Sequence, residues 1–237
     1  MRLPILVYHT IGDPSAAARY PRNCVRPEQF AAQVRALRLA GYRTITFAQY
    51  LDYRAGRGQL PRRPILLTFD DGYATVFEAA FPVLERAGFV ATIFVVTGQI
   101  NGTNAWDADE RQQRLLSAEQ IRALHGAGFE IQSHTVNHAR LPDVSADVAF
   151  SELVDSRTDL ERMLGVPVRV ICYPFAAHTA AVETLAASAG YELGVTIRRR
   201  LNRDATNPFA LRRIAVTYRT SVARLAWDLY RLRFHGD

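Results

Sequence analysis

A short pattern, alanine and glycine followed by tyrosine or phenylalanine, recurs along the chain and constrains its fold more than any other feature. It occurs at residues 40–42, 87–89, 127–129 and 189–191. An amphipathic stretch precedes each copy and an apolar stretch follows it. Because glycine just past a helix readily takes the positive φ that ends it, each copy predicts a helix followed by a strand.

The stretches before these glycines carry the signals of helix ends. Proline stands in the first turn of the first one, and Ser117 with Gln120 three residues later is typical of a capping pair. Helices are therefore expected over residues 27–40, 75–87, 117–127 and 179–189.

The stretches after or between the helices read as strands, and several are continuous apolar runs, as parallel strands covered on both faces require. Strands are expected over residues 5–8, 44–46, 65–69, 91–96, 130–133, 168–173 and 193–197. Repeated alternation of strand and helix indicates an α/β fold. Seven or eight such units favour a distorted (β/α)7-type barrel, formed as a single domain by residues 1–237. Residues 98–116 and 198–210 are expected to be long loops.

All 29 positively charged residues are arginines, and the chain has no lysine. This excludes Schiff-base lysine chemistry, a pyridoxal phosphate anchor and a P-loop lysine. Of the formal charge of +6, residues 198–237 carry +7 and the rest carries −1. A solvated basic surface is the favoured interpretation, and peripheral contact with an anionic surface is the alternative. No nucleic-acid-binding pattern accompanies the arginines, so nucleic acid is not an expected partner.

The sequence shows no evident segment that would target the chain to a membrane. No apolar run approaches the roughly 18 residues of a membrane span, and residues 1–9 do not resemble a signal peptide. A cytoplasmic location is the default expectation, and an exported form is the alternative. Residues 222–234 predict a helix docked on the core; the alternative is an interfacial membrane helix using Trp227, Tyr230 and Phe234.

Polar residues gather where predicted strands end. In a parallel α/β barrel this rim is where active sites are built, so their convergence predicts an active site. The residues concerned are His9, Asp70, Asp71, His134, His138 and the Tyr-Pro-Phe sequence at residues 173–175.

Asp70 and Asp71 end a buried strand just before Gly72. Neighbouring residues of a strand point to opposite faces, so the two carboxylates are expected to have different roles. Two ionised carboxylates this close repel each other unless a cation or a hydrogen-bond donor lies between them. The alternative interpretation is a turn that caps the following helix.

His134 and His138 are spaced to bind one ion. With one carboxylate they form a ligand set that leaves positions open for water and substrate, as catalytic metal sites require. Such a metal polarises a carbonyl and lowers the pKa of its water from about 15.7 towards roughly 7. The same ligands suit Fe(II) in an oxygenase, although strand–helix alternation argues against the usual all-β scaffold of those enzymes.

The sequences Thr-Phe-Asp-Asp-Gly at residues 68–72 and His-Thr-Val-Asn-His at residues 134–138 resemble the first two motifs of the polysaccharide deacetylases. This is the NodB-homology family, carbohydrate esterase family four. The resemblance implies a distorted (β/α) barrel and metal-dependent removal of N-acetyl groups from N-acetylglucosamine polymers. It also implies a divalent metal, zinc in the first place, with cobalt or nickel as alternatives.

The same resemblance implies roles for individual residues. Asp71, His134 and His138 correspond to the metal ligands, and Asp70 corresponds to the general base that takes a proton from water. The sequence at residues 173–175 is similar to the third motif. It implies that the backbone amide of Tyr173 holds the oxyanion and that Pro174 and Phe175 adjoin the substrate.

The chain departs from the family pattern in two places. The third motif usually carries an arginine that orients the base, but residues 171–175 have none, so Arg213 is the candidate substitute. The general acid usually follows a Leu-x-Leu strand near the C-terminus, where residues 232–235 match poorly. Leu-Val-Tyr-His at residues 6–9 matches better, which makes His9 the expected general acid. That order is similar to the circularly permuted deacetylases that act on β-1,6-linked N-acetylglucosamine polymer.

Two other functions stay open at this point. A related metal-dependent deacylase or amidase would use the same site on a small N-acyl or O-acetyl substrate. A weakly active carbohydrate-binding homologue would keep the fold and lose most of the chemistry.

Overall fold

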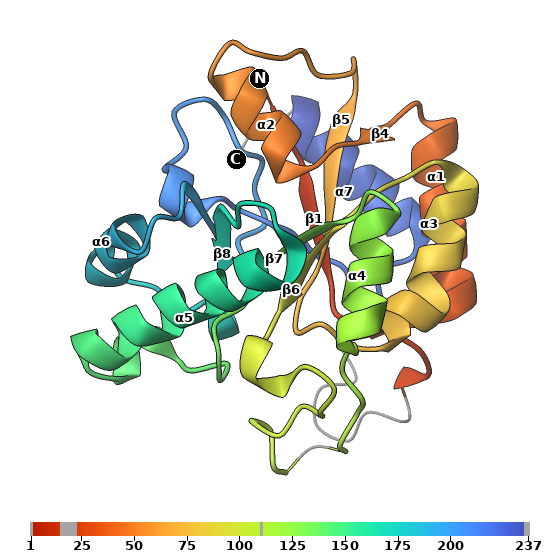
Figure 1. The fold of residues 1–237 in the computed structure, drawn as a ribbon. Helices are drawn as coiled ribbons and strands as arrows, with labels where there is room; N and C mark the ends of the chain where they lie inside the picture. The colour runs from red at the N-terminus through yellow and green to blue at the C-terminus, as the bar shows by residue number, and fades with distance from the viewer. Residues whose placement is uncertain (1, 15–22, 110, 235–237) are drawn as a thin grey trace.

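A computed structural model of the chain describes residues 2–14, 23–109 and 111–234. Its centre is a sheet of parallel strands in the order β10-β1-β5-β6-β7-β8-β9, with β4 paired to the start of β5 (Figure 1). The strands are β1 (Ile5–Tyr8), β4 (Arg43–Thr44), β5 (Pro64–Phe69), β6 (Thr92–Val95), β7 (Glu130–Ser133), β8 (Val170–Cys172), β9 (Leu193–Val195) and β10 (Ile214–Ala215). A separate pair is formed by β2 (Thr10–Ile11) and β3 (Cys24–Val25).

The two edges of the sheet meet through a short seam. Leu211 forms a parallel bridge with Val195 of β9, and Ile214 pairs with Leu6 of β1. The Leu211 amide donates to the Gly194 carbonyl at 2.8 Å, and its own carbonyl accepts from Thr196 at 2.8 Å. Residues 211–215 therefore lie between β9 and β1, and the predicted distorted barrel is confirmed.

Helices cover the outside of the sheet. They are α1 (Pro27–Leu39), α2 (Phe47–Arg54), α3 (Phe81–Ala87), α4 (Ala118–Gly126), α5 (Ala146–Leu164), α6 (Ala180–Ser188) and α7 (Val222–Phe234). In Figure 1, α1, α3 and α4 lie on one flank of the sheet, and α5 and α6 lie on the other. The predicted capping pair is present at α4, where Ser117 and Gln120 exchange hydrogen bonds with each other's backbone.

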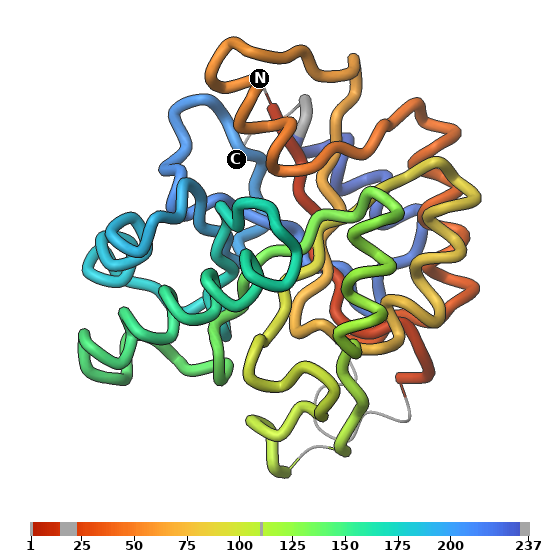
Figure 2. Tube along the Cα trace, in the orientation of Figure 1, coloured from red at the N-terminus to blue at the C-terminus, as the bar shows by residue number. Residues whose placement is uncertain are grey.

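Helix α2 closes one end of the barrel. Phe47, Tyr50 and Leu51 of this helix pack into the same apolar cluster as Ile5 of β1 and Leu66 of β5. Figure 2 shows α2 (orange) at the opposite end of the molecule from the loop at residues 97–116 (yellow-green). The other end of the barrel, where the strands have their carboxyl ends, is left for polar side chains.

The N-terminus of α2 is fixed by a carboxylate from β7. Glu130 accepts hydrogen bonds from the amides of Phe47 (2.8 Å) and Ala48 (2.9 Å) and from the Thr92 hydroxyl (2.7 Å).

Glu130→Ala leaves these donors unpaired, so we expect the free energy of unfolding to fall by about 1–3 kcal/mol. Urea denaturation measures this loss. The exposed control Glu85→Ala should stay within about 0.5 kcal/mol of the parent, and equal stabilities of the two variants would contradict the capping role.

The structure corrects several predicted boundaries. Strand β4 ends at Thr44, and Thr46 instead caps α2 with its side chain. The helix expected at residues 75–87 begins as a π-helical turn and becomes regular only at α3, whose second residue, Pro82, has no amide to donate. The sequence patterns did not predict α2, α5 or β10.

Helix α7 is docked on the core, as predicted. Leu225 and Leu229 are buried, whereas Trp227 and Tyr230 are exposed. Asp228 is buried and pairs with Arg199 and Arg224, so part of the C-terminal basic charge is neutralised within the molecule. Contact of this region with an anionic surface stays a prediction.

Within the described residues, none of the helices is both long enough and apolar enough to cross a bilayer. The weaker match to a general-acid motif, at residues 232–235, ends at His235, which lies outside the described residues.

Candidate active site

The alternation of β5 and the turn that follows it separate the two neighbouring carboxylates. Thr68 and Asp70 point into the barrel, where both contact Arg213. The chain then turns at Asp71 and Gly72, with φ of 70° and 72°. This turn directs the Asp71 carboxylate to His134 and His138. The two aspartates therefore have different partners, as predicted. Strand alternation alone is not the reason, because β5 ends at Phe69 and Asp71 adopts a left-handed backbone conformation.

Arg213 is fully buried and holds Asp70 through a bidentate ion pair. Its Nη1 lies 2.6 Å from Oδ1 of Asp70, and its Nη2 lies 2.7 Å from Oδ2. Its remaining donors reach the Thr68 hydroxyl (3.0 Å), the Thr196 carbonyl (3.2 Å) and the Cys172 sulfur (3.1 Å). The structure thus places the arginine expected to orient the base directly on that base.

This pairing sets the ionisation of Asp70. Burial alone would raise the pKa of Asp70, but the charge and hydrogen bonds of Arg213 outweigh it and hold that pKa below its usual value. Asp70 is therefore ionised at neutral pH, the form that a general base requires. His9 also lies near this carboxylate, with its Nε2 4.0 Å from Oδ2 of Asp70.

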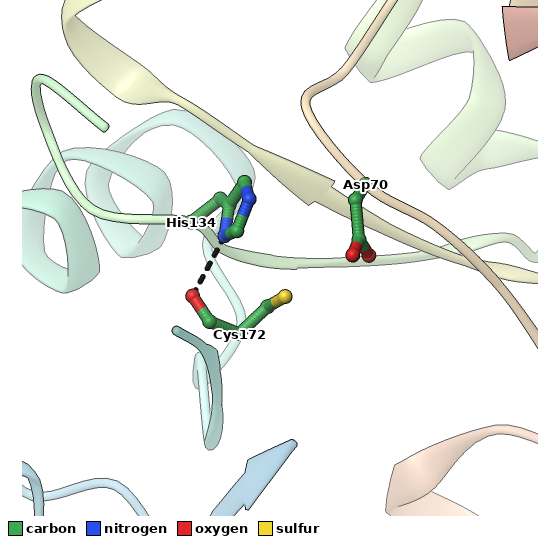
Figure 3. A group of neighbouring side chains, drawn as sticks. All are labelled: Asp70, His134 and Cys172. Carbon is green, nitrogen blue, oxygen red and sulfur yellow. Dashed lines mark hydrogen bonds between the residues drawn. The ribbon is translucent and has the colours of Figure 1, made fainter. Parts of the chain in front are cut away.

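His134 is oriented by β8. Its Nδ1 donates to the Cys172 carbonyl at 2.7 Å, as Figure 3 shows, so Nε2 is the nitrogen left to face a metal. Burial would lower the pKa of His134, but Cys172 and Asp71 outweigh it and hold that pKa well above its usual value, so without a metal Nε2 is protonated and donates to Asp71. A metal bound there would displace this proton. Nε2 lies 3.2 Å from Oδ1 of Asp71, and Nε2 of His138 lies 3.3 Å from the same oxygen. Two imidazoles and one carboxylate therefore converge on one point.

The environment of His138 also suits a metal ligand. Its ring stacks on Trp106 at 4.5 Å between centroids and meets the edge of Phe175 at 4.7 Å. Burial lowers the pKa of His138, so the ring is neutral at pH 7 and can offer a lone pair. Its buried Nδ1 has no hydrogen-bond partner among the described residues.

The donor set of Asp71, His134 and His138 fits a divalent metal. The three ligand atoms lie within 4.8 Å of one another, and hydrogen bonds from the histidines outweigh burial and hold the pKa of Asp71 well below its usual value. Asp70, His134 and Cys172 form a second set within the same distance (Figure 3). Burial raises the pKa of the Cys172 thiol, and its sulfur already accepts from Arg213, so the first set is the better metal site.

These groups open into one cavity of about 480 Å³ at the carboxyl ends of the strands. The cavity is lined by all five titratable residues that the sequence predicts to meet at this rim, His9, Asp70, Asp71, His134 and His138. The segment predicted to be a long loop, residues 98–116, contributes Asn104 and Trp106 to the lining, although no particular residue of it was predicted to belong to the site. The pocket has the size of a small-ligand site.

The Tyr173 amide lies just past the last residue of β8. It donates to the Val195 carbonyl at 3.4 Å, which is longer than an ordinary N–H···O hydrogen bond. Its role in holding an oxyanion stays a prediction. Pro174 is buried and is not among the residues that line the cavity, whereas Tyr173 and Phe175 do line it.

A parallel α/β barrel with a His-His-Asp group and a second, arginine-held aspartate at its rim is the arrangement of a hydrolase, since a metal site and a carboxylate base can together activate water. A sequence model of the family described as "Polysaccharide deacetylase" matches residues 57–194, which is more than half of the chain. The chain belongs to this family. The match begins before β5 and ends within β9, so His9 and Arg213 lie outside it.

Similar proteins of known name agree with this family. Poly-beta-1,6-N-acetyl-D-glucosamine N-deacetylase of Staphylococcus aureus (strain N315) is 23% identical over 86% of this chain and 71% of its own length. The deacetylase PplD of Streptococcus pyogenes, solved in complex with acetate, has a TM-score of 0.84 and 26% identity over 96% of this chain and 98% of its own. IcaB from Ammonifex degensii has a TM-score of 0.80 and 27% identity over 96% and 97%. The resemblance to the circularly permuted deacetylases is thereby confirmed.

Proposed function

We propose that this chain is a metal-dependent N-deacetylase that hydrolyses acetamide groups of an N-acetylglucosamine-containing polysaccharide. The observation that carries the proposal is the placement of the Asp71, His134 and His138 donor set beside the Arg213-held Asp70 in one cavity. The name of the Staphylococcus aureus relative supports the choice of substrate.

Asp71, His134 and His138 would hold the metal. When bound, a divalent metal supplies Lewis acidity for the acetyl carbonyl and lowers the pKa of water. Zinc suits two imidazoles and one carboxylate best, and cobalt and nickel accept the same donors. The hydrogen bond of His134 to the Cys172 carbonyl fixes the tautomer that such a site needs.

Asp70 and His9 carry the proton transfers in this proposal. The Asp70 carboxylate, kept ionised and oriented by Arg213, accepts the proton of the attacking water. His9 lies 4.0 Å from that carboxylate and lines the same cavity, so it is placed to give a proton to the amine that leaves. Base and acid thus come from neighbouring strands, β5 and the end of β1.

In this proposal a backbone amide of the segment at residues 173–175 holds the oxyanion. The Tyr173 amide is the first candidate, because its contact with the Val195 carbonyl is long, at 3.4 Å. Phe175 lines the same cavity in a left-handed conformation with φ of 57°, so its amide is the second candidate.

The test combines metal analysis with acetate release. We expect the purified protein to bind about one divalent ion, to release acetate from N-acetylglucosamine oligomers, to lose this activity with a chelator and to regain it with zinc or cobalt. Bound metal without acetate release would overturn the proposed polysaccharide substrate and favour a deacylase acting on a small N-acyl or O-acetyl compound. Failure to bind metal after reconstitution would overturn the whole proposal.

A further inference from the structure

The loop that joins the two histidines has an unusual backbone. Thr135 and His138 both adopt left-handed conformations, with φ of 66° and 58°, which non-glycine residues rarely occupy. Such conformations persist only where the surrounding structure enforces them. The direction of the His138 side chain depends on this backbone, so the groups that enforce it also determine where its Nε2 lies.

One side of the loop is held by the segment after β6. The amide of Thr97 donates to the Thr135 carbonyl at 3.1 Å, and the amide of Gly98 donates to the Val136 carbonyl at 2.9 Å. The approach at Gly98 is close, because a Cβ there would lie 2.7 Å from the Val136 oxygen. These contacts fix the carbonyl groups of Thr135 and Val136. The amides of Val136 and Asn137 are left to bind a group on the opposite side of the loop.

The other side of the loop is held by Glu152 of α5. One carboxylate oxygen accepts from the amides of Val136 (2.9 Å) and Asn137 (2.8 Å), and the other accepts from the Asn137 side-chain nitrogen (2.7 Å). The Glu152 residue is 7% exposed. A buried carboxylate with three donors from one short loop is a specific clamp, since charge-assisted hydrogen bonds are stronger than neutral ones.

We propose that Glu152 is a positioning residue that sets the distance between His134 and His138 and thereby the affinity of the site for a divalent metal. Glu152 does not contact the histidine rings; it acts through the amides of the residues between them. The inference rests on the proposed metal site and adds to it a determinant outside the ligand set. It also explains how two left-handed residues persist in one loop of five residues.

Glu152 is not better explained as a ligand of a separate cation. Asp147 and Asp155 share a shallow surface hollow with it, but both oxygens of Glu152 already accept hydrogen bonds from the loop. A cation there would compete with those donors. The hollow therefore carries no site, and Asp155, which is exposed on the same helix, provides a matched control.

The experiment measures metal affinity directly, by titrating the metal-free chain with zinc against a competing chelator and with cobalt(II) by absorbance. We expect Glu152→Ala to weaken zinc affinity about 10- to 100-fold and to change the cobalt(II) spectrum. Glu152→Gln keeps one acceptor oxygen, so it should recover part of the affinity. Asp155→Ala should bind as the parent does.

Circular dichroism and thermal denaturation, run alongside, show whether each variant is folded. If Glu152→Ala does not fold, Glu152→Gln decides the question, because it preserves size and shape. A folded Glu152 variant with parental affinity and cobalt(II) spectrum would overturn the positioning role, even if its melting temperature were lower. Failure of the parent chain to bind metal would instead overturn the proposed function, so the two failures are distinguishable.

Discussion

Asp70→Asn is expected to lower the rate of acetate release by about 10²- to 10⁴-fold, the usual contribution of a general base, while metal content stays at the parental level. Asparagine keeps the size of the side chain and can accept one hydrogen bond from Arg213, but it cannot take up a proton. Acetate release and elemental analysis on the same preparation measure both quantities. A variant that keeps nearly full activity would show that Asp70 is not the base.

Two controls separate the base from the metal ligands. His134→Ala removes an imidazole from the donor set, so both metal content and activity should be lost. Asp143→Asn changes an exposed aspartate outside the cavity and should leave both unchanged.

Arg213→Leu is expected to lower the free energy of unfolding by about 3–5 kcal/mol, because it leaves the Asp70 carboxylate buried without its cation. Activity should fall as well, since the carboxylate loses its orientation and its pKa rises. In the double variant with Asp70→Leu, most of the stability should return, because an apolar pair removes the uncompensated charge. Urea denaturation at pH 7 compares the free energies of unfolding of the two variants. A double variant less stable than Arg213→Leu alone would contradict this expectation.

The cost of Arg213→Leu should also depend on pH. In the parent, the ion pair lowers the pKa of Asp70, so its stabilisation is present above the unfolded value of about 3.9 and is lost in more acidic solution. In the variant, burial raises the same pKa, and protonation on acidification relieves the penalty. The stability difference between parent and variant should therefore shrink as the pH falls from 7 to 4. A difference that grows over this range would be inconsistent with an ionised Asp70.

Much of the fold was predictable because local signals agree with tertiary packing. The expected strand at residues 5–8 coincides with β1, and the Ser117 capping pair begins α4. Helix α5 has equally good end signals, Ser145 as its cap and Gly165 in a left-handed conformation after it. It escaped prediction because its end reads Leu-Gly-Val and lacks the alanine-glycine-aromatic pattern. Strand β10 has only two residues, too few to show a period.

The site was predictable in its residues but not in its contacts. Asp70, Asp71, His134 and His138 come together because each follows a strand of the same parallel sheet. The contact of the Tyr173 amide with the Val195 carbonyl depends on how β8 and β9 lie side by side, which the sequence pattern does not give. Glu152 lies on a helix that the patterns did not predict, so no signal in the sequence connected it to the loop.

The seam between β9 and β1 has a consequence for how the protein is made. Asp70 and its metal-binding neighbours are all synthesised before Arg213, and the residues that carry Arg213 also complete the hydrogen bonding of β1. A nascent chain that ends before residue 211 already contains the three proposed metal ligands, yet Asp70, the proposed base, has no buried counter-charge. Biosynthesis therefore supplies the proposed ligands first, and the segment with Arg213 completes the surroundings of Asp70 later.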